Sequence, residues 1–251
     1  MAATCGCEPQ AALAQDAGPI AAPEYKPGDT WVYDRTHESK GKSFRQERVD
    51  QVIERVGEDT VVLGVKLDGA PGDFEDHMVG LDLSEPKIFD GRTVITERLV
   101  SFPLKIGGTW EEDYVDPRQQ GIQSSAHVRR IYKVVGWEDV TVPAGTFHAL
   151  KVEANGTLVA QVYLPASAVS GAVAAPTGGT IVAHTEKARS GTATETTYRV
   201  IYYVPGIKRC VKFVDEKYNA EGVRVDRDTS VLASFKAAGE ISSASTGETQ
   251  H

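Results

Sequence analysis

The chain has few cysteines: only Cys5, Cys7 and Cys210 occur among its 251 residues. An odd number leaves at least one thiol unpaired. Cys5 and Cys7 are separated by one residue, which suits a disulfide poorly because its Cα atoms lie more than about 4.4 Å apart. A Cys-x-Cys pair with no second cluster is a weak metal signal. We therefore expect no disulfide scaffold and no metal site, and a chain of this length can bury a core without them.

Long apolar runs and excess positive charge are also lacking. No apolar run approaches the roughly 18 residues of a membrane-spanning helix, so we expect no transmembrane segment. The net charge is −8, whereas nucleic acids and anionic membranes select clustered lysine and arginine. We therefore expect no nucleic-acid partner. The glycine-rich motifs of serine hydrolases and nucleotide-binding sites are absent too, and no cofactor is expected.

The chain is instead rich in β-strand patterns. Valine, threonine, tyrosine and phenylalanine are common between turn pairs such as Lys40-Gly41, Asp90-Gly91, Asn155-Gly156 and Glu221-Gly222. No long helical period is visible. The predicted strands are 30–38, 43–56, 59–67, 74–82, 86–90, 93–101, 109–115, 125–137, 139–143, 146–154, 157–164, 196–204, 207–218 and 223–235. The pattern predicts an all-β fold, an antiparallel meander that forms an open barrel or curved sheet.

One stretch, VTVPAGTFHALKV from Val140 to Val152, could pass for an active-site loop. Pro143 presets the φ angle of a turn, and Gly145 can take the positive φ that closes a hairpin. Residues 146–152 then form the return strand, and we expect Leu150 and Val152 on its core side. Every residue has a structural role in this interpretation, which predicts a hairpin and no chemistry.

The chain also repeats itself at an offset of 79 residues. KPGDTW at 26–31 matches KIGGTW at 105–110, and the same offset maps Val49 onto Val128 and Ile53 onto Tyr132. The spacing is too long for a solenoid. We expect two similar halves, 25–103 and 104–236, within a single β domain over 25–236.

Three segments fall outside this pattern. Residues 1–24 are rich in alanine, proline and glycine, and we expect a disordered leader or linker. Ala12-Leu13-Ala14 has the form of a signal-peptidase site, although no basic and apolar regions precede it. Residues 165–195 form a long insertion rich in alanine, glycine, serine and threonine, which we expect to be a mobile loop. Residues 237–251 are expected to be a disordered tail.

A family resemblance rests on two motifs, VPAGTFHALKV and YYVPGIKRCVKF (Tyr202 to Phe213), together with the Gly-x-Thr-Trp strand starts at Trp31 and Trp110. This combination resembles exported bacterial proteins of unknown function with a fold similar to lipoprotein carriers or lipocalins. The resemblance implies a periplasmic or outer-membrane-associated location. It also implies a concave β face that holds an apolar small molecule or lipid.

Large aromatic residues on the predicted strands are the candidates for lining such a cavity. They are Trp31, Trp110, Trp137, Tyr202 and Tyr203. The alternative is that they pack in an ordinary core. The first hypothesis is therefore a non-enzymatic exported protein that binds an apolar ligand. The alternatives are a structural or protein-interaction module with a filled core, and a hydrolase with carboxylates in a cleft.

Three further groups of residues could carry chemistry, and each has a structural alternative. Asp73, Glu75 and His77 would share one strand face and could hold a cation, or could discourage pairing at a sheet edge. A second acidic run could serve a hydrolase, although glycosidase carboxylates need set separations across a bound sugar. Its members are Glu111, Glu112, Asp113 and Asp116.

Cys210 is the third. Strand alternation would place it on one face with Lys208 and Lys212, whose charges could lower the pKa of the thiol and make it reactive. The alternative is a partly buried cysteine without a role. We expect no catalytic residue among these groups.

Overall fold

The structure is a computed structural model, which describes residues 18–39, 43–89, 91–117, 123–164, 167–169, 184–186 and 189–239. Within these ranges the regular elements are strands, apart from the single 3-10 turn η1 (Pro205–Ile207). None of the described helices is long and apolar enough to cross a membrane. The prediction of an all-β chain is confirmed.

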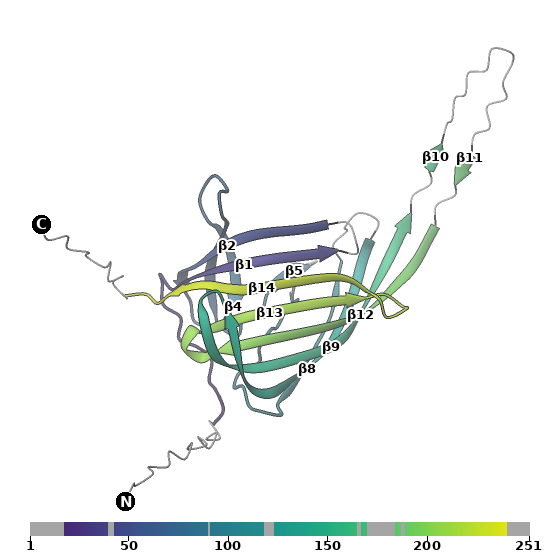
Figure 1. Cartoon of the computed structure of the whole chain (residues 1–251). Helices are drawn as coiled ribbons and strands as arrows, with labels where there is room; N and C mark the ends of the chain where they lie inside the picture. Colours follow the sequence, from purple (N-terminus) through teal and green to yellow (C-terminus); the bar gives the residue numbers. More distant parts are fainter. Residues whose placement is uncertain are drawn as a thin grey trace, which may run out of the picture.

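Ten strands form one antiparallel sheet in the order β4-β3-β2-β1-β14-β13-β12-β9-β8-β7. Figure 1 shows this sheet curving without closing into a barrel, so β4 and β7 are its edges. The strands are β1 (Thr30–Ser39), β2 (Ser43–Val56), β3 (Thr60–Leu67), β4 (Glu75–Gly80), β7 (Thr109–Asp116), β8 (Gln123–Val142), β9 (Gly145–Leu164), β12 (Arg189–Val204), β13 (Arg209–Tyr218) and β14 (Arg224–Lys236).

Two small hairpins accompany the sheet. β5 (Pro86–Phe89) pairs with β6 (Arg92–Ile95), and β10 (Ser167–Val169) pairs with β11 (His184–Glu186). In Figure 1, β10 and β11 lie beyond the ends of β9 and β12. β12 begins at Arg189, inside the predicted insertion 165–195. The mobility expected for that insertion falls largely outside the described residues.

The hairpin predicted for residues 140–152 is confirmed. β8 and β9 are joined by the turn at Pro143 and Ala144, and Gly145 has a φ of +133°. Leu150 and Val152 are buried, as expected. The residues of this stretch therefore turn the chain.

The turn predicted at Asn155-Gly156 is wrong, because β8 and β9 are continuous strands of 20 residues each. Gly156 lies inside β9 opposite Arg130, where an added Cβ would clash with the carbonyl oxygen of Arg129. The glycine therefore permits close approach of the two strands instead of a turn. A β-bulge between Val134 and Gly136 bends β8 and lets it run on past residue 137, where the sequence suggested a break.

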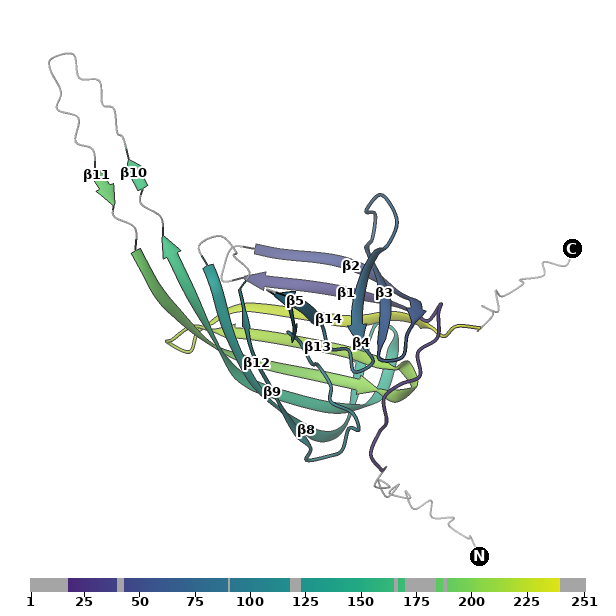
Figure 2. The same ribbon diagram turned by 180° about the vertical axis from the view of Figure 1, so that it is seen from behind.

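The connection between the two edge strands, residues 81–108, crosses the concave side of the sheet. This crossover segment carries β5, which lies in front of the sheet in the view from behind (Figure 2). Its residues Leu83, Val100 and Leu104 are buried in the main core. Phe102 makes an edge-to-face contact with Tyr203 of β12, with ring centroids 5.5 Å apart. The crossover segment therefore covers part of the face that the curved sheet encloses.

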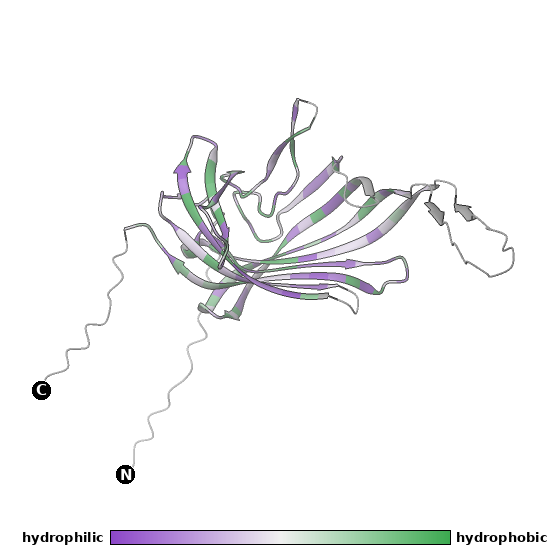
Figure 3. Ribbon diagram, turned by 90° about the horizontal axis from the view of Figure 1, so that it is seen from above, coloured by the Kyte–Doolittle hydropathy of each residue, from purple (hydrophilic) through white to green (hydrophobic). Residues whose placement is uncertain are grey.

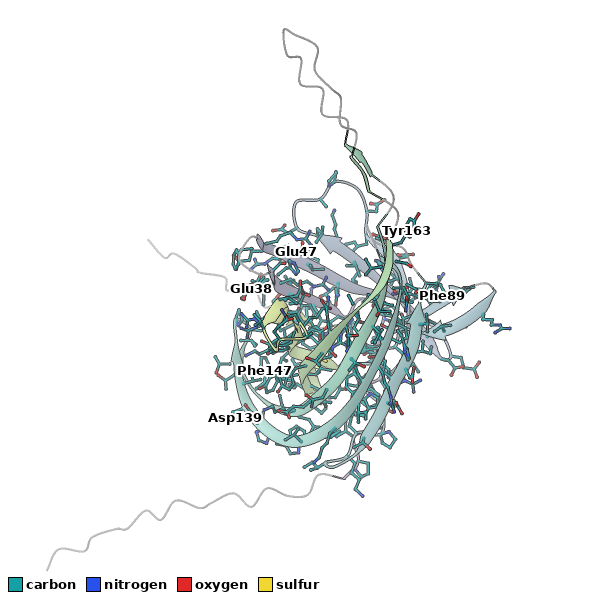
Figure 4. All side chains as sticks on the ribbon, turned by 90° about the vertical axis from the view of Figure 1, so that its right-hand side faces the viewer. Glu38, Glu47, Phe89, Asp139, Phe147 and Tyr163 are labelled. Carbon is teal, nitrogen blue, oxygen red and sulfur yellow. The ribbon has the colours of Figure 1, made fainter. Side chains whose placement is uncertain are left out.

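The enclosed face changes character along the strands. On β1, Trp31 and Tyr33 are buried, whereas Arg35 and His37, two and four residues further on, are half-buried. Apolar and polar segments alternate along the strands in Figure 3, as expected for a sheet with one buried face. Side chains project into the space within the curved strands in Figure 4, where Glu47 and Phe89 lie on opposite sides. One end of the interior is thus apolar and the other charged.

The two halves predicted from the 79-residue offset correspond in part to similar hairpins. β1 and β2 follow the first Gly-x-Thr-Trp motif, and β7 and β8 follow the second. A common duplication stays a prediction, as do the domain boundaries. The predicted leader, 1–24, is described only from residue 18, and Ile20 there exchanges two backbone hydrogen bonds of 2.8 Å with Leu104. The predicted tail, 237–251, is described only to residue 239.

Candidate functional site

One cavity of the described chain has a volume of about 1120 Å³. Its walls come from β1–β4, from β12–β14 and from the crossover segment. Strands so far apart in the sheet order can share one cavity only on the concave side. The volume slightly exceeds the range typical of small-molecule sites, about 300–1,000 Å³. The concave face therefore encloses room for a small organic ligand.

The inner part of the cavity is apolar. Leu63 and Val79 come from β3 and β4, and Leu83 and Leu99 come from the crossover segment. Tyr33 adds its ring, while its hydroxyl donates a hydrogen bond of 2.9 Å to the carbonyl oxygen of Cys210. Because this hydroxyl is satisfied, the aromatic ring is left as the surface that Tyr33 presents to a ligand.

The outer part of the cavity is charged, and most of its charges are paired. Every lining carboxylate except that of the exposed Asp76 is in an ion pair. The pairs are Arg45–Glu47 at 3.0 Å, Lys87–Glu85 at 3.0 Å, Arg199–Asp215 at 2.7 Å, Arg199–Glu97 at 3.4 Å and His37–Asp228 at 2.8 Å. These pairs occupy the carboxylates and leave them poorly placed to act on a substrate.

Two lining cations differ from the others. Arg35 of β1 and Arg209 of β13 form no ion pair or hydrogen bond through their side chains with the described residues. The guanidinium of Arg209 lies over the Trp31 ring, 5.2 Å from its centroid, and its Nη1 is buried without a hydrogen-bond partner. Gln51 also lines the cavity, and its buried Oε1 has no partner either. Oδ1 of Asp215 is buried without a partner as well, so the residues of the cavity wall hold unused donors and two unused acceptors.

A buried ionic network separates this cavity from a smaller one of about 490 Å³. Glu112 accepts hydrogen bonds of 3.0 Å from Arg130 and from the Tyr132 hydroxyl. Arg199 donates a hydrogen bond of 3.0 Å to the same Tyr132 hydroxyl. Burial disfavours the charged form of Asp215, but the neighbouring charge of Arg199 and its hydrogen bond outweigh burial and lower the pKa of Asp215. The network fixes β7, β8, β12 and β13 against one another.

This network was not predicted from the sequence. The acidic run at 111–116 was interpreted as local surface charge or as hydrolase carboxylates, yet Glu112 is only 4% exposed. Its neighbours Glu111 and Asp113 are exposed and interact with Arg129 and His127. Strand alternation alone could have separated Glu112 from them, because it points to the opposite face.

The five aromatic residues predicted to line a cavity are not gathered around it. Trp31 is fully buried, stacks on Phe235 and donates a hydrogen bond of 2.9 Å to the carbonyl oxygen of Ile207. Trp110 stacks on Tyr132 with ring centroids 4.9 Å apart and donates to the carbonyl oxygen of Arg98. Trp31 therefore packs against β14 and η1, and Trp110 packs against β8 and the crossover segment.

The other three lie elsewhere. Trp137 stacks on the exposed ring of His148. Tyr202 and Tyr203 are adjacent in β12 and so point to opposite faces. Tyr203 meets Phe102 of the crossover segment, whereas the Tyr202 ring lies beneath Lys212. Within the described chain, none of the five lines the larger cavity. A ligand-binding role for them stays a prediction.

The reactive-thiol hypothesis for Cys210 is wrong. Burial raises the pKa of its thiol to about 12, and this outweighs the opposing charges of Arg209 and Arg199. A β-bulge in the pairing of β12 with β13 skips Val211, so the alternation expected from the sequence fails there. Cys210 and Val211 are both buried as a result.

Two groups of side chains could be considered for a cation. Glu75 and His77 lie on the edge strand β4, 3.7 Å apart, while Asp73 precedes that strand. His37, Asp226 and Asp228 place their ligand atoms within 4.8 Å of one another. His37 already contacts both carboxylates, at 3.7 and 2.8 Å, which accounts for this cluster without an ion.

No protein-family model matches the chain, and no curated protein matches it. Among solved structures, a candidate exported protein with a YmcC-like fold from Bacteroides fragilis is similar, with 14% identity and a TM-score of 0.40. A candidate lipoprotein from Parabacteroides distasonis has 12% identity and a TM-score of 0.45. Each likeness covers 87% of this chain and 99% of the other. At these TM-scores and identities, neither the fold nor the function of this chain is assigned from the two structures.

Proposed function

We propose that the protein is a non-enzymatic binding protein that holds an apolar small molecule or a lipid chain in its concave face. The observation that carries this proposal is the cavity of about 1120 Å³ with an apolar inner wall. A module with a filled core would leave no such volume. The ion pairs of the lining carboxylates make a hydrolase the weaker alternative.

The physical basis of binding would be burial of apolar ligand surface. Each Å² removed from water contributes about 25 cal/mol, before the cost of ordering the ligand. Leu63, Val79, Leu83 and Leu99 supply the complementary wall. The crossover segment supplies the latter two, so it would act as the cover of the bound molecule.

An envelope location is part of the proposal and rests on the motif resemblance of the sequence. Fractionation of cells that express the native gene tests it. Recovery in the periplasmic or outer-membrane fraction supports the location, and recovery with cytosolic markers refutes it.

The binding proposal is tested with the neutral apolar fluorophore N-phenyl-1-naphthylamine. We expect saturable binding to the purified protein at one site. Val65→Phe places a bulky ring at the cavity wall and should weaken binding about 10-fold or more, since the ring takes up space that the bound molecule needs. The matched control Ile88→Phe alters an exposed residue of β5 and should leave binding unchanged.

Failure of the fluorophore to saturate would refute the proposal. Equal binding by the two variants would place the binding surface outside this cavity. Native mass spectrometry of protein purified from its own host then identifies any co-purifying molecule.

A further inference from the structure

The charged end of the cavity contains two arginines that approach each other from different strands. Arg35 lies on β1 and Arg209 begins β13, with β14 between these strands. Burial lowers the pKa of Arg35; the charge of Glu47 opposes this shift, and the smaller effect of the Arg209 charge adds to it. Two guanidinium groups therefore share one partly buried region and repel each other.

The protein does not compensate these charges as it does the others. Each of the remaining lysines and arginines in the cavity lining forms an ion pair of 3.0 Å or less with a carboxylate. Arg35 and Arg209 have no such pair among the described residues. Glu47, the carboxylate that most affects Arg35, bonds Arg45 instead. A partly buried charge without a direct partner is unfavourable, so a compensating anion from outside would be favourable here.

The orientation of Arg209 suits such an anion. Its guanidinium carbon lies over the Trp31 ring, 5.2 Å from the ring centroid, which fixes the position of the group without using a hydrogen bond. Nη1 of Arg209 is buried and has no hydrogen-bond partner. A planar guanidinium edge is the geometry that binds carboxylate and phosphate oxygens through paired hydrogen bonds.

We infer that the ligand of this cavity is amphipathic, with an oxyanion head group, a carboxylate or a phosphate monoester, bound by Arg35 and Arg209. Its apolar tail occupies the inner wall formed by Leu63, Val79 and Leu83. The inference rests on the proposed function and adds the chemistry of the head group. The apolar-to-charged order of the cavity along β1 matches such a molecule.

Head-group chemistry is tested by displacing bound N-phenyl-1-naphthylamine with ligands that share one tail. Dodecanoate and dodecyl phosphate supply the anionic head groups, and dodecanol supplies a neutral one. We expect at least one of the two anions to bind about 10-fold or more tightly than dodecanol, because hydrogen bonds to charged groups are the stronger ones. The preferred anion identifies the head group.

The two arginines are tested separately. Arg35→Gln and Arg209→Gln should each weaken binding of the preferred anion about 10-fold while dodecanol binding stays constant. The control Arg55→Gln removes an exposed arginine of β2 that lies outside the cavity and should change neither. Arg209→Lys keeps the charge but loses the planar fork, so we expect an intermediate loss.

The outcomes separate this inference from the proposed function. If the fluorophore binds but anions and dodecanol displace it equally, the head-group inference is wrong and the apolar site stands. If neither the fluorophore nor any dodecyl compound binds, both are wrong. Binding of acetate or inorganic phosphate as tightly as the dodecyl anions would show a free-anion site and overturn the amphipathic ligand. The wild-type comparison decides these cases even if a variant fails to fold.

Discussion

The buried network around Arg199 permits a sharp test of how the sheet is held together. Arg199 is 2% exposed and bonds Asp215 at 2.7 Å and the Tyr132 hydroxyl at 3.0 Å. The substitution Arg199→Met keeps most of the side-chain volume and removes the charge. Asp215 would then retain only Arg130, at 3.8 Å, as an ion-pair partner.

The size of the expected loss in unfolding free energy follows from the buried Asp215 charge that the substitution leaves without Arg199. Removal of one partner from a buried ion pair typically lowers the free energy of unfolding by about 3–5 kcal/mol, because the other charge stays buried. The matched control is Arg129→Met on β8, where the arginine is exposed and pairs with Glu111. An exposed pair contributes about 0–1 kcal/mol, so the control should lie within that range.

The pH dependence of stability provides a second readout. The pKa of Asp215 is lowered in the folded protein, so its contribution is present above the unfolded value of about 3.9 and is lost as pH falls through the folded value. In Arg199→Met, burial dominates and raises the pKa of Asp215. Acid destabilisation of this variant should therefore begin at higher pH than in the wild type.

Urea unfolding followed by circular dichroism, repeated between pH 3 and 8, measures both effects. Equal losses in Arg199→Met and Arg129→Met at neutral pH would refute the argument. The double variant Arg199→Met/Asp215→Leu removes both charges and should recover part of the loss, since apolar replacement of a buried pair is often tolerated.

Two further predictions concern single residues. Because burial raises the pKa of Cys210 to about 12, its peptide should resist alkylation by iodoacetamide at pH 8 until urea unfolds the protein. Mass spectrometry of that peptide checks this, and rapid labelling of the folded protein would contradict it. Gly156→Ala should lower the unfolding free energy by about 1–3 kcal/mol, because its Cβ would meet the Arg129 carbonyl, whereas Gly191→Ala, with nothing within 4 Å, should have little effect. Thermal unfolding compares the two, and equal midpoints would show that β8 and β9 separate without cost.

Most of the strand pattern could be predicted from the sequence. Turn chemistry fixed the hairpin at Pro143 and Gly145, and alternation placed Leu150 and Val152 in the core. The misplaced turn at Asn155-Gly156 has a physical cause. A glycine that opens a turn and one that admits a neighbouring backbone look identical in one sequence.

The site could not be predicted in the same way. The walls of the cavity come from β1, β3, β13 and the crossover segment. Only the curvature of the sheet brings these elements together. Strand patterns record which face a residue occupies but not which distant residue it meets. No sequence motif marks Arg35 or Arg209 as part of a site. The five aromatic residues were predicted instead because large aromatic side chains on strands are typical of ligand cavities.

The pairing of β1 with β14 has a consequence for how the sheet assembles. Thr30 pairs with Lys236, so the central seam joins the first and last strands of the sheet in chain order. That seam cannot form until β14, about 200 residues after β1, has emerged from the ribosome. Contacts between residues so distant in sequence also slow folding. Before the seam closes, β1 and β14 each have one edge without a partner strand. The incompletely folded chain therefore exposes two strand edges that can pair with other chains, and both are covered in the interior of the folded sheet.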